Sequence, residues 1–131
     1  MIDESKIDFE NLTKEEALYL HRKLWATIAE LTYKLQRPIS KEYVFELYHW
    51  PYAKWDCWCC EYGSQKDAVC ARCPVYWGKY IDDNCQSFGS PYTKWLKSKY
   101  EWYAYKECSK ADLWKMIRCA RKIALLPERE D

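Results

Sequence analysis

Four of the eight cysteines in this 131-residue chain form two C-x-x-C pairs, Cys57 with Cys60 and Cys70 with Cys73. A C-x-x-C turn lets two thiolates reach one ion, and two such turns complete the tetrahedral shell that zinc prefers. The spacing therefore predicts a zinc site. Because four thiolates leave no position for water or substrate, the predicted zinc is structural and not catalytic.

Other interpretations of the cysteines stay open. Cys59 and Cys85 are additional candidate ligands, with Cys85 the first substitute. The thiols could instead be small buried hydrophobes or hold an iron–sulfur cluster. A thioredoxin-like redox pair is disfavoured because no strand–helix–strand pattern surrounds either C-x-x-C. The stretch 52–90 has no regular hydrophobic period, and a structural zinc would supply on the order of 10 kcal/mol towards ordering it.

Two helices are expected before this stretch. Thr13 followed by Glu16 is a capping-box signature, and apolar residues then recur at steps of three and four from Lys14 to about Gln36. The apolar positions are Ala17, Leu20, Leu24, Ile28, Leu31 and Leu35. Pro38 ends the first helix, and Ser40 can cap a second from Lys41 to about Tyr48.

Two more helices are expected after it. Ser90 and Pro91 suit the cap and first turn of a helix from Tyr92 to about Glu107, and Ser109 with Asp112 begins another from Lys110 to Leu126. The prediction is one mainly α domain over residues 1–131, with about four helices and a central irregular Cys-rich zinc-binding loop. Its parts are the N-terminal helices (13–50), the zinc loop (52–90) and the basic aromatic helices (91–126).

Composition and charge exclude several classes of protein. Lys plus Arg is 21 and Asp plus Glu is 20, so the net charge of +1 gives no global affinity for nucleic acid. No apolar run approaches the roughly 20 residues that span a bilayer, and Met1 to Glu10 carries acids where a signal peptide would be apolar. We therefore expect a soluble, intracellular protein with no membrane partner.

The charge is nevertheless uneven, because residues 91–126 hold nine basic and three acidic side chains. Seven Trp and Tyr residues are interleaved with these bases, a pattern that suits phosphates and nucleobases together. The alternative is that the rings are core and the bases are the solvated face of two helices. A homo-oligomer is one way to bury part of such a surface. The residues predicted to bind a ligand are Trp95, Trp102, Tyr103, Lys94, Lys99 and Arg118.

The cysteine segment also resembles a known group of proteins. It reads C-W-C-C-E-Y from Cys57 and C-A-R-C-P-V from Cys70, followed by Trp77, Cys85 and the stretch from Ser90 to Trp95. These motifs resemble small, largely uncharacterised proteins of tailed bacteriophages and prophages, over roughly residues 56–95. The resemblance implies a phage origin, a zinc site and a location in the host cytoplasm. Cys59 departs from the usual pattern of that group.

Two functions follow as hypotheses. The first is a non-enzymatic, zinc-stabilised phage accessory protein that counters host defence by capturing a phosphorylated or nucleotide ligand, or by docking on a host defence protein. The second is a zinc-stabilised nucleic-acid-binding module. Catalysis is disfavoured because the only histidines are His21 and His49, and nothing in the sequence orients either as a base beside a cysteine. A purely structural phage component is a third class.

Overall fold

The computed structural model describes residues 2–51, 58–59, 62, 74–75, 77, 85, 89–104 and 109–128. This part of the chain is mainly helical, as expected, and contains four α-helices and one short 3-10 helix, η1 (Glu4–Lys6). In the described residues β-structure is limited to one isolated antiparallel bridge, between Val75 and Glu128. None of the described helices is long and apolar enough to cross a membrane.

The longest helix, α1 (Lys14–Leu35), begins at the predicted capping box. The Glu16 amide donates to Thr13 Oγ1 at 3.1 Å, and the Thr13 amide donates to Glu16 Oε1 at 2.9 Å. At the other end Gln36 adopts a left-handed conformation with φ 55°, which stops the helix two residues before Pro38. Local sequence therefore sets both ends of α1.

The remaining helices also match their predicted positions to within a few residues. They are α2 (Lys41–Leu47), α4 (Pro91–Ala104) and α5 (Ser109–Ala124). Ser40 caps α2 as predicted, and the Ser90 hydroxyl accepts from the Thr93 amide at 3.2 Å at the start of α4. α5 ends two residues earlier than predicted, because the Leu126 amide bonds to the Ile123 carbonyl three residues back and tightens the last turn.

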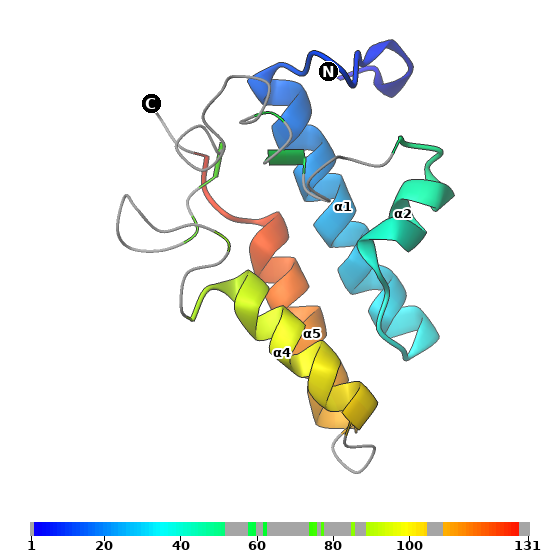
Figure 1. Cartoon of the computed structure of the whole chain (residues 1–131), viewed down its shortest axis with the longest axis vertical. Coiled ribbons are helices and arrows are strands. Elements are labelled where there is room, and N and C mark those ends of the chain that lie inside the picture. The colour runs from blue at the N-terminus through cyan, green and yellow to red at the C-terminus, as the bar shows by residue number, and fades with distance from the viewer. Residues whose placement is uncertain are drawn as a thin grey trace.

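Helix α5 lies at the centre of the arrangement and packs against both α1 and α4 (Figure 1). It runs antiparallel to α4, and α2 packs on the far side of α1. One hydrophobic cluster joins these elements and extends from the N-terminal segment to the C-terminal end of α5. The hydroxyl of Tyr92 on α4 accepts from Lys41 of α2 at 3.0 Å, so a hydrogen bond also links these two helices.

The core is dominated by aromatic rings. Trp95 of α4 meets Trp25 of α1 edge-on, with ring centroids 5.1 Å apart, and stacks on Tyr92 at 6.1 Å. His21 of α1 is fully buried, and its Nε2 lies 3.1 Å from the Ile123 carbonyl of α5. These contacts hold the three long helices in a fixed register, since bulky rings pack in few ways.

Parts of the cysteine-rich stretch are also anchored in this core. Trp58 is 1% exposed and lies between Phe9 and Phe45, with ring centroids at 5.2 and 5.5 Å. Trp77 is 4% exposed and meets His21 edge-on at 5.9 Å. Two tryptophans of the stretch are therefore held by ordinary hydrophobic packing, at one site on the α2 side and one site against α1.

Candidate functional site

A groove of about 520 Å³ runs between α4 and α5, within the size range of small-molecule sites. It is lined by side chains from both helices: Pro91, Lys94, Lys97, Ser98 and Glu101 on α4, and Lys115, Arg118, Cys119 and Lys122 on α5. On α5 the three bases follow each other at steps of three and four, so the helix places them on one face. The groove thus holds five cations and one carboxylate, Glu101.

Within the described residues, these five cations are not paired with carboxylates. In the described part of the chain, none of them lies within 4.0 Å of a carboxylate oxygen, and the ion pairs there involve other lysines. Like charges that share a groove repel one another, and this repulsion is relieved when an anion enters. The arrangement is therefore chemically suited to bind an anion with several oxygens, such as a phosphate.

A free thiol lies among the cations. Burial raises the pKa of Cys119, and the charges of Lys94, Lys122 and Arg118 oppose this without cancelling it, so the pKa stays above the ordinary range. The thiol is therefore held protonated at neutral pH and is a weak nucleophile. Lys94 comes from α4, Arg118 and Lys122 come from α5, and all three line the same groove as this thiol.

The six residues predicted to bind a ligand are divided by the structure. Lys94 and Arg118 line the groove together. Trp95 instead points into the core, at 1% exposed, and Lys99 Nζ lies 5.3 Å from the centre of its ring.

The other two predicted residues lie next to each other near the C-terminal end of α4. Trp102 is partly buried and meets the ring of Tyr103 edge-on at 5.0 Å, while Tyr103 is 61% exposed. Neither belongs to the groove lining. Sequence reasoning missed Lys97, Lys115 and Lys122 as site residues. The i, i+3, i+7 spacing of Lys115, Arg118 and Lys122 on α5, and the i, i+3 spacing of Lys94 and Lys97 on α4, could have identified them.

The predicted zinc ligands Cys57, Cys60, Cys70 and Cys73 lie outside the described residues. Of the alternative ligands, Cys59 is fully buried in the core and Cys85 is partly buried. Among the described residues no group of three or more His, Cys, Asp and Glu side chains could hold a metal ion. The zinc site stays a prediction from the spacing of the cysteines.

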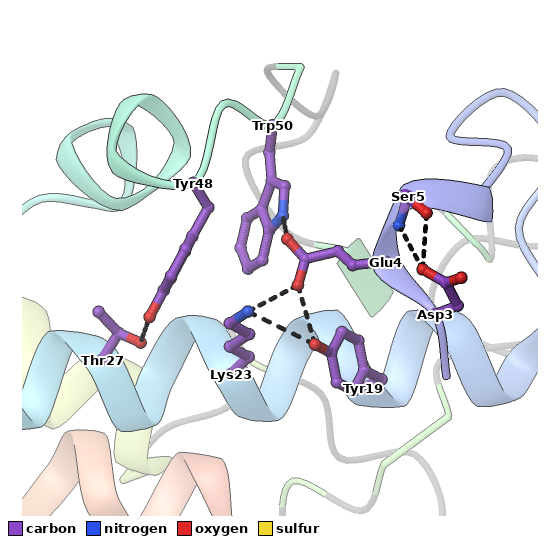
Figure 2. A network of polar contacts seen from close by, with 8 residues as sticks. All are labelled: Asp3, Glu4, Ser5, Tyr19, Lys23, Thr27, Tyr48 and Trp50. Carbon is purple, nitrogen blue, oxygen red and sulfur yellow. Dashed lines mark hydrogen bonds and ion pairs between the residues drawn. The ribbon is translucent and has the colours of Figure 1, made fainter. Parts of the chain in front are cut away.

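A second polar cluster joins the N-terminal segment to α1 and to the end of α2 (Figure 2). The Glu4 carboxylate accepts from Tyr19 at 2.8 Å, from Lys23 at 2.6 Å and from the Trp50 indole at 2.5 Å. Lys23 Nζ also lies 4.2 Å from the centre of the Tyr48 ring, a cation–π contact. We call Glu4, Tyr19, Lys23, Tyr48 and Trp50 the Glu4 network.

The pKa values of the network reflect this pairing. Burial raises the pKa of Glu4, but the hydrogen bonds from Lys23, Trp50 and Tyr19 and the charge of Lys23 outweigh it, so the pKa lies below its ordinary value. Burial lowers the pKa of Lys23, but its bonds to Glu4 and Tyr19 outweigh burial, so the net shift is upward. The hydrogen bond to Glu4 raises the pKa of Tyr19. All three groups are held in their ordinary charge states at neutral pH.

Nothing in the described part of the chain indicates catalysis. His21 is fully buried, with its Nε2 3.1 Å from the Ile123 carbonyl, and His49 is exposed just after α2 with φ 58°. Neither histidine lines the groove that holds Cys119. Comparison of the chain with family models, curated proteins and solved structures finds no match.

Proposed function

We propose that this protein is a non-enzymatic binding protein that captures a phosphorylated small molecule in the α4–α5 groove. The observation that carries the proposal is the convergence of five cations, none paired with a carboxylate in the described structure, on one groove of small-molecule size. If these bases were only the solvated faces of α4 and α5, there would be no reason for both helices to direct them into the same groove.

The wider role is proposed from the motifs of the cysteine segment. Their resemblance to small tailed-phage proteins supports an accessory protein in the host cytoplasm that counters host defence. Capture of a phosphorylated signal would do this by occupancy alone, with no reaction on the ligand. Docking on a host defence protein is the other route to the same outcome, and it does not need the groove.

Isothermal titration calorimetry with inorganic pyrophosphate and with adenosine 5′-monophosphate tests the groove. We expect wild-type protein to bind both, and the Arg118→Gln, Lys122→Gln double variant to lose at least tenfold in affinity. Arg121→Gln is the matched control, because Arg121 is on the same helix but lines a different hollow, between α1 and α5. An equal loss in the control, or no binding of either probe to the wild type, would contradict the proposal.

The nucleic-acid alternative is separated by salt dependence. If the groove follows a nucleic-acid backbone, a single-stranded oligonucleotide binds more tightly than the mononucleotide, and its affinity falls by orders of magnitude between low and moderate salt. A small ligand in the groove makes few phosphate contacts and loses much less. We expect the second behaviour.

We also propose that Cys57, Cys60, Cys70 and Cys73 bind one structural zinc. The measurement is native mass spectrometry of protein purified without chelator, compared with the denatured sample. The wild type should carry the mass of one zinc, and the Cys57→Ser, Cys60→Ser double variant should lose the metal and unfold at a lower temperature. Cys119→Ser is the matched control and should keep the metal. A metal-free wild type would contradict the proposed zinc site.

A further inference from the structure

The two ends of the α4–α5 groove differ in charge. Lys94 and Glu101 are seven residues apart on α4, and Lys122 and Lys115 are seven apart on α5, so the lining extends for about 10 Å along each helix. Figure 1 shows that α4 and α5 run antiparallel, so the start of α4 lies near the end of α5. In agreement, the charges of Lys94 and Lys122 both act on Cys119. Glu101, near the end of α4, is then towards the start of α5, where Lys115 is the first base of the lining. Among the described lining residues, the charged side chains at the end near Cys119 are all cationic, whereas Glu101, the one carboxylate, is at the other end.

Glu101 itself is partly exposed, and no ion pair within the described residues involves it. A carboxylate at this position repels a phosphate and accepts hydrogen bonds from hydroxyl or amino groups. The cationic end has the opposite preference. Together the two ends select a ligand that is anionic at one end and rich in hydrogen-bond donors at the other.

We infer that the groove binds a nucleoside monophosphate in one orientation, with the phosphate between Lys94, Arg118 and Lys122 and the sugar and base towards Glu101. This inference rests on the proposed function, since it assumes that the groove binds phosphates. It adds the ligand class and the polarity of binding. The length of the lining is comparable with that of a mononucleotide from its phosphate to its base.

The Glu101→Gln variant tests this orientation with two probes. Adenosine 5′-monophosphate has donors to offer to Glu101, whereas inorganic pyrophosphate places only negative charge there. We expect Glu101→Gln to bind the nucleotide about tenfold more weakly, because a charge-assisted hydrogen bond is lost. The same variant should bind pyrophosphate equally or more tightly, because a repulsive carboxylate is removed.

Glu30→Gln is the matched control, since Glu30 pairs with Lys34 on α1 and does not line the α4–α5 groove. It should change neither affinity, and circular dichroism should show the helical content of both variants to be that of the wild type. If Glu101→Gln moves both affinities in the same direction by the same factor, the orientation is wrong although the groove binds anions. If neither probe binds the wild type, the proposed function fails together with this inference.

Discussion

Lysines are used in two different ways in this molecule, in the Glu4 network and in the α4–α5 groove. Lys23 Nζ lies 2.6 Å from a Glu4 carboxylate oxygen and 4.2 Å from the centre of the Tyr48 ring, so its charge is compensated within the protein. The groove lysines come from two helices, and their charge is not balanced by any carboxylate within ion-pair distance in the described structure. A compensated charge stabilises the fold, whereas converging uncompensated charges are available to a ligand.

The positions of the two regions fit this division. The Glu4 network joins η1 to α1 and to Trp50, three residues beyond α2, so it connects segments 46 residues apart in the sequence. The groove lies between α4 and α5, and in the described structure its bases form no ion pair with another element. Stability and binding should therefore respond to different lysines.

The largest expected effect comes from making the same substitution in both regions. Lys23→Met removes the ion pair and leaves the Glu4 carboxylate without its cation, which should lower the free energy of unfolding by about 2 kcal/mol and leave anion binding unchanged. Lys122→Met should leave the free energy of unfolding unchanged or raise it, because repulsion in the groove is relieved, and should weaken pyrophosphate binding about tenfold. Urea denaturation and calorimetry measure the two quantities.

If the two variants behaved alike, the assignment of Lys23 to stability and of the groove lysines to binding would be wrong. Equal losses of stability would mean that the groove lysines support the fold. A loss of pyrophosphate binding in Lys23→Met would mean that the anion site extends to the Glu4 network.

A smaller effect is expected from Thr27→Val. Thr27 Oγ1 lies 2.8 Å from the hydroxyl of Tyr48, whose ring faces Lys23 (Figure 2). Removing one hydrogen bond from this partly buried pair should cost about 1 kcal/mol by thermal or urea denaturation. Tyr48→Phe removes the same bond from the other side, and the double variant should cost little more than either single one. Fully additive losses would show that the bond contributes nothing.

The smallest expected effect is a pH dependence located at Glu4. Folding lowers the pKa of Glu4. The contribution of the Glu4 carboxylate to the free energy of unfolding is therefore complete above the unfolded-state pKa and is lost as the pH falls through the folded-state pKa. Folding raises the pKa of Lys23, so the contribution of Lys23 to the free energy of unfolding is lost only as the pH rises into the alkaline range. The difference in Tm between wild type and Glu4→Gln should therefore be largest near neutral pH and shrink on acidification. A difference that stays constant on acidification would rule out the ion pair as its source.

The helices could be predicted because their signals are local. Thr13 and Glu16 cap α1 through bonds between residues three apart, and Ser40 caps α2 in the same way, so no distant contact is needed to place these ends. The start of α4 at Pro91 follows from the Ser90 cap for the same reason. By contrast, the order of packing, with α5 between α1 and α4, depends on which apolar faces fit together, and periodicity does not encode that choice.

The candidate site was predicted only in part. The sequence placed an excess of bases and rings in residues 91–126, but helical spacing alone cannot tell which rings become core. Trp95 is buried because it meets Trp25, a residue 70 positions away, whereas Lys94 beside it lines the groove. The burial of Trp58 and Trp77 could not be predicted in the same way, because the stretch 52–90 has no hydrophobic period that would indicate which of its side chains face the core.

By itself, the sequence determined where the helices begin and end, the basic character of the last two, and the cysteine spacing that predicts zinc. These properties depend on residues close together in the chain, whose hydrogen bonds, charges and backbone preferences act locally. Only the tertiary structure decided that Lys23 is compensated by Glu4 and that the bases of α4 and α5 converge without compensation. Both outcomes require side chains from different elements to meet, and only the packing of the aromatic core determines which of them do.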